Sequence, residues 1–285
     1  MKKKLFIGMT IGTAVLAAAC GNTADVKENT TETSDLTLEE VFEKTLERQQ
    51  ELKSTKADMN ISQNMDMMMG DDSFTLSTVS DMTMETVVKP MQLYAEGTTA
   101  MVDPESGEEM KMPLKMYMTE ADGFYLYEET MGGWFKMAGE SYEDILSQAG
   151  MQNDPTEQLK QLQQFVSDFT FEQSDDEFIL MLNAQGDKFM SFLLEQIGGS
   201  LGEGADDIKK AFEGTNVEDA QYVLTIDKET FDLTTMVMDL AMTMEMDGMT
   251  TKIDQTSTVN YYDFNSVENI VIPQEVIDTA QELSF

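Results

Sequence analysis

The sequence predicts an α+β fold built on one large antiparallel sheet in a single domain. Three observations lead to this expectation. The order of elements along the chain is helix, strands, helices, strands. Long stretches at 57–69, 74–88 and 233–262 alternate apolar and polar residues, as strands with one buried face do. About 250 residues follow the N-terminal segment, which is enough for one domain on a big curved sheet.

Residues 1–19 are expected to be a signal peptide, because Lys2, Lys3 and Lys4 precede an apolar run too short to span a bilayer. The run ends in Leu-Ala-Ala-Ala-Cys-Gly at 16–21, which resembles a bacterial lipobox. Cys20 matches the lipidated cysteine of that motif. Ala17 stands where the motif prefers leucine, and Leu16 lies one position further out. The alternative is an ordinary secretory signal followed by a chance cysteine.

Lipidation of Cys20 would determine where in the cell the protein is located. We expect a diacylglyceryl group and palmitate at Cys20, which would anchor the protein to the outer, extracytoplasmic face of the cell membrane. Cys20 is the single cysteine of the chain, so no disulfide is expected. Residues 20–36 contain almost no large apolar residue and are expected to form a disordered tether. Such a tether would reach roughly 20–25 Å from the membrane.

The ordered domain is expected over residues 37–285. Thr37 and Glu40 form a capping box, and the apolar face that follows predicts an amphipathic helix. A long strand is expected to begin near Ala57, and the glycine and aspartates at 70–72 break it before a second strand of the same length. Shorter strands follow at Met91–Glu96, Met112–Met118, Gly123–Tyr127 and Trp134–Met137.

Helices are expected in the middle of the chain at 142–149, 155–166, 187–197 and near 208–212, with a hairpin formed by 169–173 and 177–182. Three long strands are then expected at 222–227, 233–246 and 250–262. Asp247-Gly248 is a hairpin signal between the last two. Pro273 is expected to open a terminal helix with Val276, Ile277, Ala280 and Leu283 on its apolar face.

Composition argues against most enzyme classes. The chain has no histidine, which removes histidine-dependent catalysis and histidine-based zinc sites. No phosphate-binding glycine motif is present, and the Asp-rich turns do not follow EF-hand spacing. Without Lys2, Lys3 and Lys4, 15 basic residues face 54 acidic ones, a net charge of −39 that repels nucleic acid. We therefore expect no enzymatic activity, no cofactor, no metal and no nucleic-acid partner.

Methionine is the most unusual feature, with 26 in the chain. Strand alternation predicts that methionines from several strands share one apolar face with Ile61. The candidate ligand-binding residues are Met59, Ile61, Met65, Met67, Met69, Met82, Met84, Met236, Met238, Met242, Met244 and Met246. These side chains could line a deformable cavity for a hydrophobic ligand or simply fill an irregular core. A third alternative is a Cu(I) site, since thioethers are soft ligands.

Four stretches together resemble bacterial lipoproteins of the LolA/LppX-like superfamily, in particular its Gram-positive branch. They are the helix entering a strand at 38–61, FYLYEETMGGWFKM at 124–137, YVLTIDKETFDLTTMVMDL at 222–240 and YDFNSVENIVIPQEVI at 262–277. The resemblance implies a half-barrel wrapped around several helices, with acyl chains held between sheet and helices. It transfers no residue beyond Cys20.

The sequence therefore predicts a monomeric, membrane-anchored lipoprotein that binds an acyl chain or another hydrophobic molecule at the cell envelope. The alternative is a structural or interaction lipoprotein with a filled core and no small ligand. Methionine-based Cu(I) binding is the third hypothesis.

Overall fold

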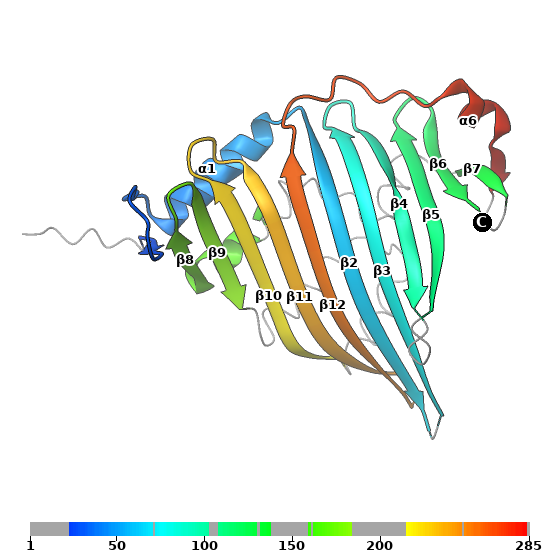
Figure 1. Cartoon of the computed structure of the whole chain (residues 1–285), viewed down its shortest axis with the longest axis horizontal. Coiled ribbons are helices and arrows are strands. Elements are labelled where there is room, and N and C mark those ends of the chain that lie inside the picture. The colour runs from blue at the N-terminus through cyan, green and yellow to red at the C-terminus, as the bar shows by residue number, and fades with distance from the viewer. Residues whose placement is uncertain are drawn as a thin grey trace, which may run out of the picture.

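A wide, open and curved sheet dominates the protein (Figure 1). The computed structural model describes residues 23–70, 72–102, 108–129, 132–137, 159–160, 162–183, 215–246 and 248–283. Within these residues thirteen strands form a single sheet, and every pair is antiparallel except the two outermost. The predicted large antiparallel sheet is confirmed. The predicted helices at 142–149, 187–197 and 208–212 lie outside the described residues.

The sheet consists of two antiparallel meanders that meet at strands β2 and β12. Its order is β1-β8-β9-β10-β11-β12-β2-β3-β4-β5-β6-β7-β13. The strands are β1 (Asp25–Val26), β2 (Ser54–Met69), β3 (Asp72–Val87), β4 (Gln92–Val102), β5 (Glu109–Thr119), β6 (Gly123–Glu128), β7 (Gly133–Met137), β8 (Phe169–Gln173), β9 (Glu177–Asn183), β10 (Asn216–Asp227), β11 (Leu233–Met246), β12 (Met249–Tyr262) and β13 (Gln281–Leu283). The last long strand thus lies beside the first one, from Tyr262 opposite Lys56 to Met249 opposite Met69.

The predicted first helix is α1 (Leu38–Glu51), and its capping box is present. The Thr37 hydroxyl accepts from the Glu40 N–H at 3.2 Å, and the Glu40 carboxylate accepts from the Thr37 N–H at 2.9 Å. These bonds hold the pKa of Glu40 below its ordinary value. Leu38, Val41 and Phe42 are buried, and they pack on residues of β8 to β11. We call the sheet face under α1 the inner face, and the opposite one the outer face.

The N-terminal part differs from the expectation of a disordered tether. Residues 23–36 run along the edge of the sheet, where β1 pairs with β8 in parallel. The buried Gln173 side chain accepts from the Ser34 N–H at 2.8 Å and donates to the Ser34 carbonyl at 3.1 Å. The Asp175 carboxylate accepts from the N–H groups of Glu32 and Thr31, which lower its pKa. Polar side chains from a distant hairpin therefore order a segment that has little apolar surface of its own.

The C-terminal part covers the opposite edge of the sheet. The helix α6 (Gln274–Thr279) is shorter than the sequence predicts, and Leu283 lies in β13 instead of on the helix. β13 pairs in parallel with β7. Val276 and Ile272 bury Tyr125 on the outer face of β6. Because unpaired edge strands invite aggregation, each terminal segment protects one edge of the sheet.

The other described helical residues are the 3-10 helix η1 (Gln163–Asp168) and residues 159, 160 and 162 just before it. Leu159, Leu162 and Phe165 are buried there against the core under α1. The described part of the protein therefore holds fewer helices than an α+β half-barrel wrapped around several helices would require. The hairpin of β8 and β9 is confirmed.

One glycine marks a close approach of two strands. Gly97 on β4 lies opposite Met82 on β3. A Cβ atom at Gly97 would be 2.0 Å from the Asp81 carbonyl oxygen and 2.7 Å from the Met82 Cα. Only glycine fits between these backbones without a shift of one strand.

Candidate functional site

The register of the sheet places all of the candidate apolar residues on the inner face. From β11 to β3, one row across the strands consists of Met236, Val259, Met59 and Met82. A lower row consists of Met242, Ile253, Met65 and Leu76. The remaining candidates occupy the same inner parity, including Ile61, Met67, Met69, Met84, Met238, Met244 and the backbone position of Met246.

Met68 lies on the other face of β2. It pairs with Thr250 and Ser73, one outer-face position further along β2 than Asp66, which pairs with Lys252 and Thr75. Two adjacent methionines, Met67 and Met68, thus point to opposite faces from the same stretch of strand.

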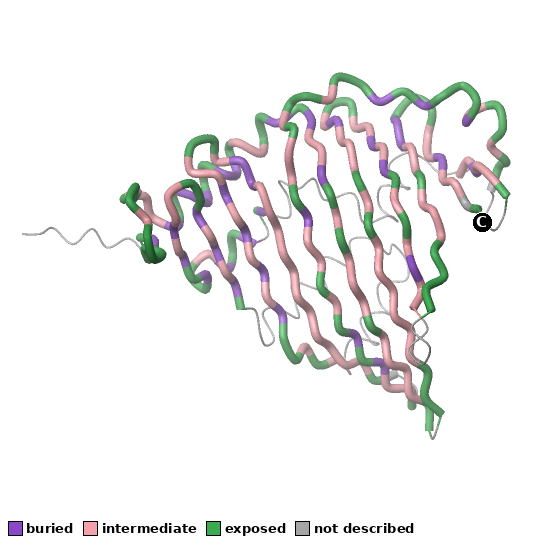
Figure 2. Tube along the Cα trace, in the orientation of Figure 1, coloured by how far each residue is buried: buried purple, intermediate pink, exposed green. Residues whose placement is uncertain are grey.

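Packed clusters occupy the two ends of the inner face. At one end the α1 cluster joins Phe42, Phe178, Leu180 and Leu224, with Met236 and Met238 at its margin. At the other end Leu93, Ala95 and Met118 are buried together. The central strands β12, β2 and β3 lie between these clusters, and Figure 2 shows that most of their residues are only partly buried.

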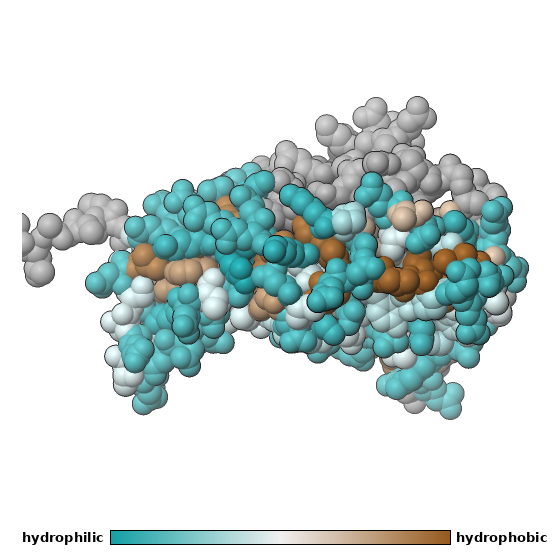
Figure 3. Space-filling model, turned by 90° about the horizontal axis from the view of Figure 1, so that it is seen from above, coloured by the Kyte–Doolittle hydropathy of each residue, from teal (hydrophilic) through white to brown (hydrophobic). Residues whose placement is uncertain are grey.

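Large apolar side chains are exposed at the lower end of the inner face, beside the hairpin of β2 and β3. Met69 is 65% exposed there, and Phe74 on β3 is 59% exposed. Met110, near the start of β5 and in the row of Met101 and Thr78, is 59% exposed. Seen from above, apolar surface also forms a band with hydrophilic surface on both sides (Figure 3). Exposed apolar groups at the end of an apolar face are typical of a place where a ligand or partner enters.

Polar side chains cross the inner face, and sequence reasoning did not select them. We call this group the polar belt; its members are Gln63, Thr78, Ser80, Thr99, Gln255 and Ser257. All six are partly buried. The Gln63 amide N–H donates to Gln255 Oε1 at 3.5 Å, and the Ser80 and Thr99 hydroxyl oxygens lie 2.9 Å apart. The signal was available, because Gln63 has the same parity in the sequence as Ile61 and Met65.

Two tyrosines on the inner face stay neutral over a wide pH range. Burial raises the pKa of Tyr222 on β10 to about 12, and burial does the same for Tyr261 on β12. Tyr222 lies opposite Met238, and Tyr261 lies opposite Ala57. Both phenols add polar atoms to an apolar surface without adding charge.

Charge is confined to the outer face over the central strands. No inner position of the described residues of β11, β12, β2 or β4 carries a charged side chain, and none of β3 does between Phe74 and Thr86. Asp58, Asp81, Glu96 and Lys115 line an open outer groove of about 570 Å³. There the Tyr94 hydroxyl donates to Glu96 at 2.7 Å, which lowers the pKa of Glu96.

Cys20 lies outside the described part of the chain, so its predicted lipidation stays a prediction. Within the described residues, no group of three or more Asp, Glu, His or Cys side chains is arranged to hold a metal ion. No helix there has the length and apolar character needed to cross a membrane.

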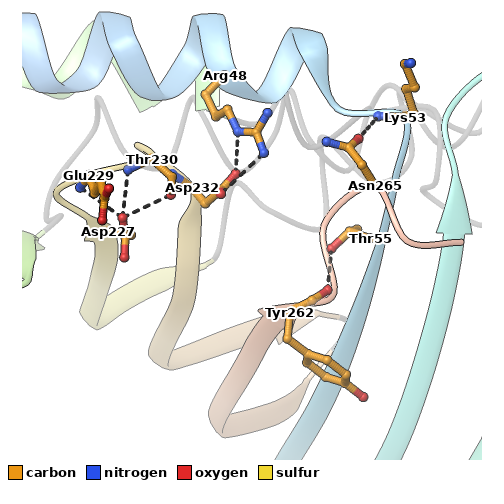
Figure 4. Close-up of polar contacts among 9 residues, drawn as sticks. All are labelled: Arg48, Lys53, Thr55, Asp227, Glu229, Thr230, Asp232, Tyr262 and Asn265. Carbon is orange, nitrogen blue, oxygen red and sulfur yellow. Dashed lines mark hydrogen bonds and ion pairs between the residues drawn. The ribbon is translucent and has the colours of Figure 1, made fainter.

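Contacts between α1 and the last strands hold the helix over the inner face (Figure 4). Arg48 donates to Asp232 through Nε at 2.6 Å and Nη2 at 3.4 Å. Asp227 Oδ1 accepts from the N–H groups of Glu229 and Thr230 and so shapes the turn before β11. The Asn265 side chain accepts from the Lys53 N–H at 2.7 Å, just after α1 ends.

Comparisons with known proteins place the chain in a family without an established role. A family model described as a family of unknown function, DUF6612, matches residues 37–281. No curated protein matches the chain.

Several solved structures show a weak likeness to this chain. A DUF1329 family protein from Desulfovibrio piger is 12% identical, with 79% of this chain and 93% of that one covered and a TM-score of 0.21. The LolA superfamily protein NE2245 from Nitrosomonas europaea is 11% identical, with 85% and 97% covered and a TM-score of 0.19. A beta-barrel-like DUF1849 protein from Brucella abortus is 9% identical, with 73% and 98% covered and a TM-score of 0.17.

Proposed function

We propose that this chain, which belongs to the DUF6612 family of unknown function, is a monomeric, non-enzymatic lipoprotein that binds an acyl chain or another hydrophobic molecule on its inner face. Cys20 would anchor it to the outer face of the cell membrane. The observation that carries the proposal is the shared inner face of the candidate residues, which joins methionines of β2, β3 and β11.

The chemistry of this face suits a hydrophobic ligand. Methionine is unbranched and polarisable, so a methionine-rich surface adapts to ligands of variable shape. The face lacks charge over its central strands, and large exposed apolar groups lie at its lower end. These features support uptake of an apolar molecule onto the inner face from that end.

Mass spectrometry of lipids extracted from the natively purified protein tests the proposal directly. A co-purified acyl lipid, or saturable binding of a fluorescent fatty acid, is the expected result. A protein that carries no lipid and binds no fluorescent fatty acid would favour the structural or interaction lipoprotein with a filled core.

Two neighbouring methionines provide a matched pair of variants. Met67→Asp places a carboxylate on the inner face, whereas Met68→Asp makes the same change on the outer face. An apolar ligand would have to desolvate the new carboxylate in the first variant, so its affinity should fall at least about 10-fold. The second variant should change the affinity less than about 2-fold. Equal effects of both variants would place the ligand elsewhere.

Anchoring needs its own experiment. In the intact cell, Cys20→Ala should release the protein from the membrane fraction and abolish its labelling by a palmitate analogue. Continued labelling of the Cys20→Ala protein would exclude Cys20 as the lipidated residue.

Cu(I) binding remains a second candidate because of one row of methionines. The register places Met69 opposite Met249, and Met249 opposite the backbone position of Met246, on three adjacent strands where neighbouring positions are about 4.8 Å apart. Thioethers are suitable Cu(I) ligands. A titration under reducing conditions against a chromophoric Cu(I) chelator tests this candidate. The absence of competition, or competition unchanged in Met69→Leu/Met249→Leu, would exclude it.

A further inference from the structure

The polar belt divides the inner face into two apolar parts. Gln255, Gln63 and Thr78 form one row across β12, β2 and β3. Ser257, Ser80 and Thr99 lie in the neighbouring row, interrupted by Ile61. Positions two residues apart on a strand are about 6.8 Å apart, so the two rows form one continuous strip.

Apolar residues flank this strip on both sides along the strands. On one side lie Val259, Met59 and Met82, and on the other lie Ile253, Met65 and Leu76. Polar groups on an apolar face are unfavourable unless they form hydrogen bonds. Within the described residues, the belt side chains form only the Gln63–Gln255 and Ser80–Thr99 hydrogen bonds.

Each belt side chain can form more hydrogen bonds than these. A glutamine amide has two N–H donors and one carbonyl acceptor, and a hydroxyl both donates and accepts. The belt therefore offers donors and acceptors to a further polar group. It contains no arginine or lysine, which recognition of a carboxylate or phosphate would favour. The matching group on a ligand is an ester, an amide or a hydroxyl.

We propose that the polar belt binds the uncharged ester or hydroxyl group of a neutral acyl glycerolipid, and so selects it over a plain hydrocarbon. This inference rests on the proposed hydrophobic-ligand function and names the ligand class. From Gln63 to Met69 the strand extends about 20 Å, which gives an acyl chain a path from the belt to the exposed lower end. The ester of the ligand then lies at the belt, and its chain lies along the methionines of β2 and β11.

A displacement assay with three defined lipids tests the proposal on the full-length protein. Dioleoylglycerol, octadecane and dioleoyl phosphatidic acid compete for an uncharged naphthylamine fluorophore bound to the protein. Dioleoylglycerol should displace the fluorophore at the lowest concentration. Failure of both dioleoylglycerol and octadecane to bind would refute the proposed function. Equal affinity for these two, or tighter binding of the anionic lipid, would overturn only the role of the belt.

Variants that conserve shape isolate the hydrogen bonds. Gln63→Met/Gln255→Met replaces both amides by side chains of similar length that match their neighbours. Each lost hydrogen bond should reduce the preference for dioleoylglycerol over octadecane by about 2- to 10-fold. Octadecane should bind this variant at least as tightly as before. Gln221→Met makes the same chemical change on the outer face of β10, where it should leave the preference unchanged.

A second double variant keeps the proposal testable if the first one does not fold. Ser80→Ala/Thr99→Val removes the two hydroxyls of the neighbouring row and should also reduce the preference. A preference unchanged in either folded pair would overturn the proposal. Failure of both pairs to fold would assign the belt to the internal packing of the chain and would overturn it too.

Discussion

The ion pair between Arg48 and Asp232 should hold α1 in place over the inner face. Arg48 lies in the last turn of α1, and Asp232 precedes β11. The Asp232 side chain is 7% exposed and that of Arg48 is 25% exposed. The carboxylate receives one short bond of 2.6 Å and a second, longer one of 3.4 Å. Loss of this pair should therefore loosen the helix that covers one end of the sheet.

Asp232→Ala removes both bonds and leaves the guanidinium without its acceptor. A hydrogen bond to a charged group contributes about 1.5–3 kcal/mol, and removal of one partner of a fully buried pair costs about 3–5 kcal/mol. Because water reaches part of Arg48, we expect the loss to fall in the first of these ranges, at about 2–3 kcal/mol in the free energy of unfolding. For a domain of this size the melting temperature should fall by about 4–12 °C.

Urea unfolding followed by circular dichroism measures this loss. Glu109→Ala is the matched control, because Glu109 and Lys111 form an ion pair whose side chains are 50% and 65% exposed. The control should lose less than about 1 kcal/mol. The double variant Arg48→Ala/Asp232→Ala completes a mutant cycle. If the losses of the two single variants add to that of the double variant within about 0.5 kcal/mol, the pair contributes no coupling and does not hold α1 in place.

Three further predictions concern the edge of the sheet, the close contact of β3 and β4, and the pH dependence of stability. Gln173→Leu should destabilise the protein by about 1–3 kcal/mol, because it leaves backbone groups of Ala24 and Ser34 without their partner; hydrogen exchange of residues 24–36 should accelerate, and unchanged protection would contradict the docking role of Gln173. Gly97→Ala should lower the urea midpoint of unfolding much more than Gly70→Ala. A Cβ atom at Gly97 would lie 2.0 Å from backbone, whereas one at Gly70 meets nothing within 4 Å and adds only the strain of φ +63°. Similar midpoints for the two variants would refute the close approach of β3 and β4. Burial raises the pKa of Tyr222 from 10.0 to about 12 in the folded protein. Its contribution to the free energy of unfolding is therefore complete below pH 10 and falls by up to about 3 kcal/mol as the pH rises towards 12. Tyr222→Phe should flatten this alkaline decline in unfolding experiments, and an unchanged decline would exclude Tyr222 as its source.

Local patterns predicted much of the sheet. The capping box of Thr37 and Glu40 located the start of α1, and alternation located β2, β3, β11 and β12 to within a few residues. A strand with one buried face imposes period two on its own sequence, so this information is local. The same parity correctly grouped Met65 and Met67 and separated Met68.

Long-range contacts were not predictable in this way. Order in residues 23–36 depends on Gln173 and Asp175, which lie about 140 positions later in the chain. The polar composition of the segment indicated disorder, and only the folded hairpin of β8 and β9 supplies the partners that order it. Leu283 fits a helical pattern, yet the free edge of β7 offers it a strand partner.

The distribution of methionine along the inner face bears on whether that face is filled or adaptable. Where the face is packed under α1, phenylalanine and leucine dominate, as in Phe178, Leu180 and Leu224. Met59, Met65, Met67, Met82, Met242 and Met244 belong to none of the core clusters of the described residues. Branched and aromatic side chains specify tight packing better than methionine does. A face meant only to be filled would need such residues at its centre as much as at its ends. The presence of these six methionines outside the core clusters, on both sides of an uncharged polar belt, therefore favours a surface that adapts to an amphiphilic ligand.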